Sequence, residues 1–491
     1  MKRSVVAAVV VFVLAGLAVA AVPLVQRHAA AEIKAEIERD GTTKVEDVEV
    51  GLFDRSVTLT NVRSTRVVTI SAERWTVSGL AWPLGDVLRG RVPTGGWQLG
   101  DPLQADRIDV TGLRVAGAGG QPWTIGSIAI EGVDLARYDG EVDPGPYRPV
   151  ILGARIMRAL AVRRFEERGF AYTVPGETNS ITIASISFED LAHGKLGAFL
   201  LSGFRMTGSN PGEEIRLDQV KAAGLDLERV FTSMSAATWR LGMPLGRVGL
   251  DSARASGFGG KTFASRGLAL GSVTTESTHE TGGVTRARTR IEGFMFAPPL
   301  RGLESMQARL MMTAMGLKEL KLGFDCAGTE DRVSNEVTIE RCALEGVDLG
   351  EVNLTGKLVQ LDQAFWAAMD TADAAKLAAS TAALGSAQLV LADKSLLERS
   401  LKALAAVTAQ PVATARANLA QEIRHFQPTG VLITDDLTKL LDTVARFVEQ
   451  GGTLTIHAKP EPPFGLDKVR VLRSPGPDLV DVLGLSATLS R

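Results

Sequence analysis

Residues 128–135 read IAIEGVDL, a unit in which aliphatic side chains alternate with small or polar ones and then skip two positions. Successive side chains of a β-strand point to opposite faces of the sheet, so the alternation gathers the aliphatic ones on one face. The double step shifts the phase of the alternation, as a β-bulge or tight bend does, and the strand curls while its apolar face stays on one side. The unit therefore predicts a curved sheet with one apolar face.

The same unit recurs along the chain, as IASISFEDL at 183–191 and LEGVDLGEVNL at 344–354. Shorter alternating stretches precede it at Val45–Val50, Ser56–Val62 and Arg107–Val110. Each stretch ends in a Gly, Asn or Asp turn signal. Many short strands of this kind favour a long, curved antiparallel sheet over a compact parallel one.

Helical patterns are concentrated in the last quarter of the chain. Before it, one helix is predicted over Val150–Arg168. The expected fold class is mainly β with helices (α+β), with an N-terminal transmembrane helix, a curved antiparallel repeated-β sheet and a helical C-terminal region. After Leu361 the predicted elements are helices over Gln363–Leu384, Ser395–Ala409, Val412–Phe426, Asp435–Gln450 and Pro477–Leu485, and strands over Gln388–Leu391 and Thr453–His457.

The N-terminus carries an uncharged, almost wholly apolar run from Ser4 to Val25. As a helix this run would reach roughly 33 Å at ~1.5 Å per residue, enough to span a hydrocarbon core of ~30 Å. The alternative is a cleaved signal peptide, because Ala18–Ala20 has the form of a cleavage site. The basic Lys2 and Arg3 favour a cytoplasmic N-terminus. We therefore expect a single-pass inner-membrane protein with its bulk in the periplasm.

Three regions follow from these patterns. Residues 1–30 are the predicted transmembrane anchor, 31–360 a periplasmic curved β-sheet region, and 361–491 a helix-rich C-terminal region with a few strands. The composition and hydrophobic periodicity of the sequence change most clearly near residue 360, where Ala-rich helical patterns replace the strand-like alternation.

Composition and motifs argue against several functions. A net charge of -2 and 5% aromatic residues do not suit nucleic-acid binding. Five histidines and two cysteines are too few and too scattered for a Cys/His zinc site. Gly257–Thr262 is a near miss to a phosphate-binding loop, since Ala255 stands where that loop needs glycine, and we interpret it as a glycine-rich hairpin. We predict no enzyme activity and no cofactor, and interpret Arg286–Arg290 as a solvated strand face.

Cys326 and Cys342 flank a hairpin-like segment. Matching the apolar faces opposes Phe324 to Ile339 and Cys326 to Val337, which keeps the sulfur atoms too far apart to bond. A wider loop centred near Ser334 would bring the two cysteines opposite each other. An oxidising compartment favours the disulfide, and two buried free thiols are the alternative.

The opening VEDVEVGLFDRSVTLTNVRS at 45–64, behind the apolar N-terminus, resembles that of AsmA-like proteins. The strands at 316–358 resemble the repeated strands of that group and of YdgA-like proteins, and the C-terminal part resembles uncharacterised proteobacterial envelope proteins. The resemblance implies an inner-membrane-anchored periplasmic protein whose repeated β-units form a groove-like sheet. It also implies a role in carrying or organising lipids, with no catalytic residues.

The expected function is therefore non-enzymatic. We expect an apolar β-groove that binds or guides lipids, or supports outer-membrane assembly, with Ile130 and Ile186 as candidate lipid-facing residues. The expected partners are the inner membrane, phospholipids and other envelope proteins. The alternative is a structural or interaction scaffold of the cell envelope with a packed, dry core and no lipid function.

Overall fold

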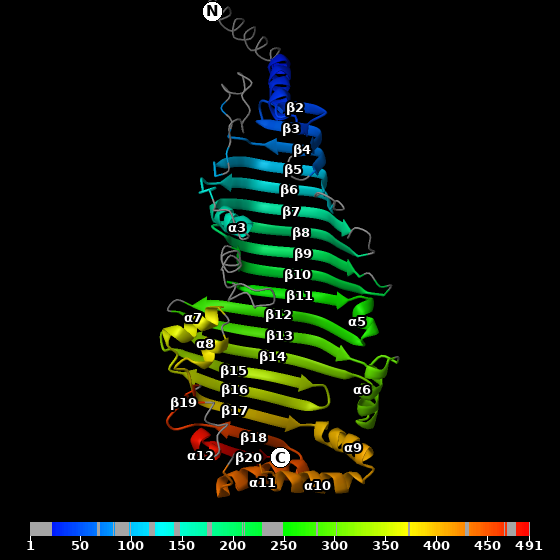
Figure 1. The fold of residues 1–491 in the computed structure, drawn as a ribbon, viewed down its shortest axis with the longest axis vertical. Helices are drawn as coiled ribbons and strands as arrows, with labels where there is room; N and C mark the ends of the chain where they lie inside the picture. The colour runs from blue at the N-terminus through cyan, green and yellow to red at the C-terminus, as the bar shows by residue number, and fades with distance from the viewer. Residues whose placement is uncertain are drawn as a thin grey trace, which may run out of the picture. The chain divides into compact units, whose positions relative to one another are not determined.

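The chain divides into two compact units, Met1–Trp239 and Arg240–Arg491. In each unit, long antiparallel strands follow one another along the chain, and helices are added at the margins (Figure 1). The computed structural model describes residues 22–65, 69–81, 83, 98, 100–116, 123–141, 148–173, 179–208, 210, 212–227, 249–280, 283–300, 302–371, 374–427, 432–465, 467–468 and 478–490.

Unit 1 begins with a helix over residues 22–38 and continues as an antiparallel meander. Each strand from β2 to β10 pairs with the next along the chain, and β1 pairs with β3. The elements are β1 (Thr43–Lys44), β2 (Asp47–Gly51), β3 (Ser56–Ser64), β4 (Thr69–Ser78), β5 (Leu103–Ala116), β6 (Trp123–Leu135), α3 (Arg148–Ala159), β7 (Leu160–Thr173), β8 (Ser180–Ala192), β9 (Lys195–Thr207) and β10 (Glu214–Asp226).

The predicted phase shifts are present within these strands. In β6 the double step contains Gly132 (φ 63°), and in β8 it contains Asp190 (φ 55°). The pairing register stays constant across both residues, so these are bends that neighbouring strands share, without the extra residue of a bulge. The third unit, at 344–354, differs: it spans the turn between two strands of unit 2, with Asp348 at φ 60°.

Two helices of unit 1 cover parts of the apolar face of its sheet. Ala29 and Ile33 of the first helix are buried in one cluster with Val48 and Val133. The second cluster, centred on Val162, includes Met157 of α3. Both helices therefore lie against the sheet through aliphatic side chains.

Unit 2 repeats the meander and adds more helices. Consecutive strands pair from β11 to β18, while β19 returns to β17 and β20 to β18. The elements are β11 (Ser252–Gly259), α5 (Lys261–Ser265), β12 (Leu268–Glu280), β13 (Val284–Phe296), α6 (Leu303–Ala314), β14 (Leu320–Asp331), β15 (Glu336–Gly346), β16 (Gly350–Val359), α7 (Gln363–Thr371), α8 (Ala374–Ala378), β17 (Ala383–Asp393), α9 (Leu396–Thr408), α10 (Val412–Arg424), α11 (Asp435–Gln450), β18 (Thr453–Ala458), β19 (Phe464–Gly465), α12 (Leu479–Leu483) and β20 (Leu485–Ser490).

Helices α5 to α9 of unit 2 lie toward opposite ends of its strands (Figure 1). At one end, Phe365 and Trp366 of α7 are buried against Val337 and Leu358 of the sheet. At the other end lie α5, α6 and α9 (Figure 1). Helices α10 and α11 pack together through Ala420 and Ala445 and lie along the last strands of the sheet, where α11 contacts β20. The middle of the strands lies between α7 and α8 at one end and α5, α6 and α9 at the other.

The structure corrects the predicted fold class at the N-terminus. Among the described residues, no helix is long and apolar enough to span a membrane. The helix over 22–38 carries several charged residues and is docked on the sheet by Ala29 and Ile33. The described residues therefore form an antiparallel sheet with helices; Ser4–Ala21, most of the apolar run, lies outside the described residues.

Further predictions change in extent. In place of one helix over Gln363–Leu384 the structure has α7 and α8, and Ala383 and Leu384 already belong to strand β17. The helix expected over Val150–Arg168 ends at Ala159, and the rest belongs to strand β7. The segment Gly257–Thr262 is not a simple hairpin, because the helix α5 stands in the connection between β11 and β12. Past residue 361 the sheet of unit 2 continues through β17, β18 and β20, so the added helices do not mark its end.

Gly203 tests the importance of these left-handed bends. Its φ is 66°, and an added Cβ would lie 2.7 Å from the Cβ of Ala184. Because both the backbone strain and the close contact oppose a side chain, Gly203→Ala should lower the free energy of unfolding by about 1–3 kcal/mol. Gly323→Ala is the control, since it has open space and no positive φ. Equal urea midpoints for both variants and the wild type would contradict this reading.

Candidate functional site

The strands of unit 1 separate apolar from polar side chains across the sheet. The pairing register joins Ile130, Phe165 and Phe188 into one cross-strand row, and the Phe165 and Phe188 rings stack at 4.6 Å. We call the side of the sheet that carries this row the apolar face of unit 1. It comprises Leu103, Ala105, Ile108, Val110, Leu113 and Val115 of β5; Trp123, Ile125, Ile128, Ile130, Val133 and Leu135 of β6; Leu160, Val162, Phe165, Glu167, Phe170 and Tyr172 of β7; Ile181, Ile183, Ile186, Phe188 and Leu191 of β8; Leu196, Phe199, Leu201, Phe204 and Met206 of β9; and Ile215, Leu217, Val220, Ala222 and Leu225 of β10.

The other side of the same strands carries ion pairs. Arg107 bonds Asp109 at 2.7 Å and Glu131 at 3.0 Å. Arg168 donates to Glu166 at 2.7 Å. Ion pairs between exposed side chains add little stability, but they identify this side as the one that faces water.

Much of the apolar face has no cover among the described residues. Val162, Leu191 and Leu196, near α3, are buried. Farther along the strands, Ile186 and Leu201 are half-buried, and Met206 is 37% exposed. Aliphatic side chains in a row across several strands would normally be fully buried, so this part of the face is suited to an added apolar partner.

The two predicted lipid-facing residues lie on this face in different surroundings. Ile130 packs against both buried clusters of unit 1. Ile186 belongs to neither cluster, and its cross-strand neighbours are Glu167 and Leu201. Ile186 is therefore the better probe of the open surface, whereas Ile130 contributes to the core.

Unit 2 has a corresponding apolar face in the middle of its strands. A cross-strand row there joins Cys326, Cys342, Leu354 and Leu389. Leu354 is 39% exposed, and its neighbour on the same face, Leu344, is 44% exposed. Both are large aliphatic residues at positions where a closed core would bury them.

A cavity of about 350 Å³ lies where this face meets the helices of unit 2. Leu322, Leu344 and Leu391 line it from the sheet, while Leu397 of α9 and Phe447 of α11 line it from the helices. Its size and apolar lining suit a hydrocarbon chain more than a polar ligand.

The polar side of unit 2 carries the predicted arginine run. Arg288 donates to Asp325 at 2.7 Å, and Arg290 and Arg341 lie within 4 Å of the same carboxyl. An open hollow of about 740 Å³ on this side is lined by three basic and three acidic side chains, which does not favour an anion site. The basic residues are Arg290, Lys321 and Arg341, and the acidic ones Glu292, Asp325 and Glu345.

The Asp325 cluster gives a pH-dependent prediction. Hydrogen bonding from Arg288 holds the pKa of the Asp325 carboxyl below its usual range. A lowered pKa stabilises the fold above the unfolded-state value of about 3.9, and this contribution is lost as the pH falls through the folded-state value. Asp325→Asn should therefore lower the urea midpoint at pH 7 and have little effect near pH 2. Glu345→Gln is the exposed control; an equal loss at both pH values for Asp325→Asn would contradict the electrostatic cause.

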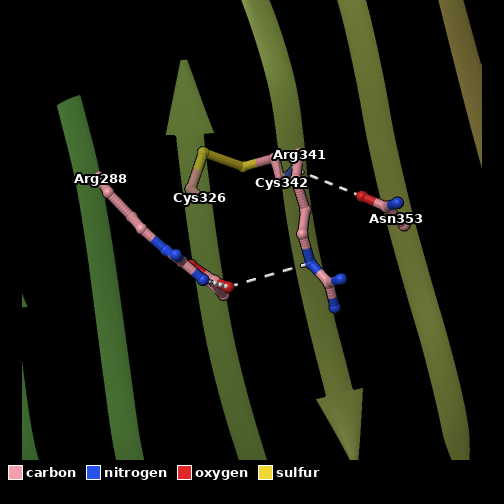
Figure 2. Close-up of a disulfide and its surroundings, with 6 residues drawn as sticks. Arg288, Cys326, Arg341, Cys342 and Asn353 are labelled. Carbon is pink, nitrogen blue, oxygen red and sulfur yellow. Dashed lines mark hydrogen bonds and ion pairs between the residues drawn. A yellow bond between two sulfur atoms is a disulfide. The ribbon is translucent and has the colours of Figure 1, made fainter. Parts of the chain in front are cut away.

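Cys326 and Cys342 form a disulfide between β14 and β15 (Figure 2). The predicted opposition of Cys326 to Val337 is wrong: the hairpin turns at 332–335, and Val337 faces Glu330. Glu340 is an extra residue in β15 that shifts the register by one, which brings Cys342 opposite Cys326. Without this bulge, Cys326 would face Arg341.

Removal of the disulfide should destabilise unit 2. The bond closes a loop of sequence separation 16, so the double variant Cys326→Ser, Cys342→Ser should lose about 3 kcal/mol on the chain-entropy model. Under denaturing, non-reducing conditions an alkylating reagent should label neither cysteine, and after reduction it should label both. Labelling of both thiols without reductant would mean that the bond is absent.

The described residues contain no group of three or more His, Cys, Asp or Glu side chains that could hold a metal ion. Residues 343–490 match a protein family described as "Uncharacterized protein". No curated protein matches the chain. The matched segment runs from β15 to β20 and includes the helices α7 to α12.

Sequence reasoning missed Glu167, the one charged side chain among the described positions of the apolar face of unit 1. A signal was present in the sequence. The stretch from Leu160 repeats the apolar alternation, and Glu167 stands two residues after Phe165, where an aliphatic residue is expected.

Proposed function

We propose that the protein is a non-enzymatic component of a bacterial cell envelope whose apolar sheet faces bind acyl chains of lipids. The observation that carries the proposal is the half-exposed row of large apolar side chains across β6 to β10, opposite a side rich in ion pairs. The disulfide fits an exported location, because such bonds persist in oxidising compartments.

Acyl chains are the partner that best fits the composition of this surface. Apart from Glu167, Tyr172, the indole N–H of Trp123 and the thioether of Met206, the apolar face of unit 1 offers hydrocarbon. A polar ligand would need hydrogen-bonding groups that fix its orientation, and few are present. A hydrocarbon chain needs none, and it gains roughly 0.8 kcal/mol for each methylene group that it buries.

A photocrosslinking residue at position 186, compared with one at position 185, tests the proposal directly. Ile186 lies on the apolar face, and Ser185 lies on the opposite face beside Arg168. With vesicles of phosphatidylethanolamine and phosphatidylglycerol that carry labelled acyl chains, position 186 should crosslink to lipid and position 185 should not. Equal labelling at the two positions would count against a binding face.

Charge substitutions separate binding from folding. For this test the photocrosslinking residue replaces Leu201. Ile186→Asp should then reduce lipid crosslinking at least tenfold, because burying a charge under a hydrocarbon chain costs more than about 1.4 kcal/mol of binding free energy. The protein should remain folded, since Ile186 lies in neither core cluster of unit 1. Ser185→Asp is the matched control. Ile130→Asp should instead destabilise the fold, because Ile130 packs against buried side chains.

The competing proposal is a scaffold whose sheet faces are packed by protein. It forecasts that Ile186→Asp unfolds the protein as readily as Ile130→Asp and that position 186 crosslinks to no lipid. Loss of folded protein in both variants, together with no lipid on the wild type, would leave the scaffold as the better account.

A further inference from the structure

Glu167 lies in the middle of the apolar face of unit 1. Its cross-strand neighbours are Ile128 on β6 and Ile186 on β8, and beyond Ile186 the row continues to Leu201 and Val220. The carboxyl makes no hydrogen bond or ion pair with another described residue. It therefore interrupts an otherwise hydrocarbon row in the half-buried part of the face.

The preceding residue provides a direct comparison. Glu166 points to the opposite side of β7, where Arg168 donates to its carboxylate at 2.7 Å and Arg164 lies 3.9 Å away. Two adjacent, half-buried glutamates thus occupy contrasting environments: Glu166 is paired with arginine on the polar side, and Glu167 has no such partner among the described residues and lies among apolar side chains.

Charged groups near Glu167 do not compensate for its surroundings. The residues that face it from β6 and β8 are aliphatic or aromatic, and on its own strand the one other titratable group of the face is Tyr172. Helix α3, packed on β7 and β8, carries Arg158 and also Arg155, which is ion-paired with Asp139 at 2.7 Å. Burial alone raises the pKa of the Glu167 carboxyl.

We propose that Glu167 couples acyl-chain binding on unit 1 to proton uptake, so that a chain lying across this face binds the form with a neutral carboxylic acid. The inference rests on the proposed function. One proton from solvent adds to one carboxylate oxygen as the chain covers it, and the same proton leaves when the chain departs. Glu167 thereby makes acyl-chain binding stronger at pH values where its carboxyl can be protonated. An ionised carboxylate under hydrocarbon would lose its hydration water without gaining a hydrogen-bonding partner.

The direction of the pH dependence follows from this coupling. The bound chain removes the remaining water, so the pKa of Glu167 is higher in the bound state than in the free state. Affinity is then greatest below the free-state pKa, falls as the pH rises from the free-state to the bound-state value, and is constant above it. Each unit of difference between the two values corresponds to about a tenfold loss of affinity.

The test uses the full chain and phosphatidylcholine with a fluorescent acyl chain, a lipid whose headgroup keeps its charge between pH 5 and 8. Wild type and Glu166→Gln should lose affinity as the pH rises, whereas Glu167→Gln should keep its low-pH affinity throughout. Glu167→Leu, which matches the neighbouring side chains, should do the same. Calorimetry in buffers of different ionisation enthalpy should detect proton uptake on binding near neutral pH for the wild type and none for Glu167→Gln.

Each outcome is informative. A pH-dependent loss of affinity that persists in Glu167→Gln, or wild-type binding without pH dependence or proton uptake, would overturn the role of Glu167 and leave lipid binding intact. Absence of lipid binding by the wild type at every pH, with the protein folded, would overturn the proposed function and this inference together.

Discussion

Each long strand must keep its apolar side chains on one face while the sheet bends, and the left-handed residues inside the strands make this possible. In β9, Gly203 separates Leu201 from Phe204, which lie on the same face although three residues apart. The bend at that step places two consecutive residues, Ser202 and Gly203, between these side chains, while the pairing register with β8 and β10 stays constant. The apolar rows therefore continue across the sheet and remain in register from strand to strand.

The same constraint produces a surface that the units cover incompletely. A meander of long strands has one apolar face as wide as the strands, and unit 1 provides two described helices to cover it. These bury the part around Val162 and Val133 and leave Ile186 and Leu201 half-buried. In unit 2, helices α5 to α9 lie toward the strand ends (Figure 1), and Leu344 and Leu354 remain exposed on the sheet. Exposed aliphatic rows in both units favour a bound apolar partner over a defect of packing.

The sequence predicted what is local and missed what depends on pairing. The alternation and double step at 128–135 predicted both the strand and the bend at Gly132, because the face that each side chain occupies follows from its position in the strand. The helix over Val150–Arg168 was drawn too long, since Leu160, Val162 and Phe165 fit a helical stripe as well as a strand. The register of β14 and β15 was wrong because the extra residue, Glu340, has no local signature. Ile130 packs against the buried clusters and Ile186 does not. This difference depends on where the helices pack on the sheet, which no short sequence pattern shows.

Glu167 shows that the environment of a charged residue depends on the side of the sheet that it occupies. In the sequence it is one of two adjacent glutamates in a charged stretch, and a count of charges treats them alike. The sheet separates them: alternation turns Glu166 toward arginine and Glu167 toward hydrocarbon. A buried, unpaired carboxyl lowers stability unless it is protonated, and a packed core would gain from an aliphatic residue there. Glu167 lies in the open part of the apolar face and not under α3, so water can reach its carboxyl and the loss of stability is small when the face is empty. The free-energy cost of the ionised carboxyl then depends on whether an apolar partner covers it.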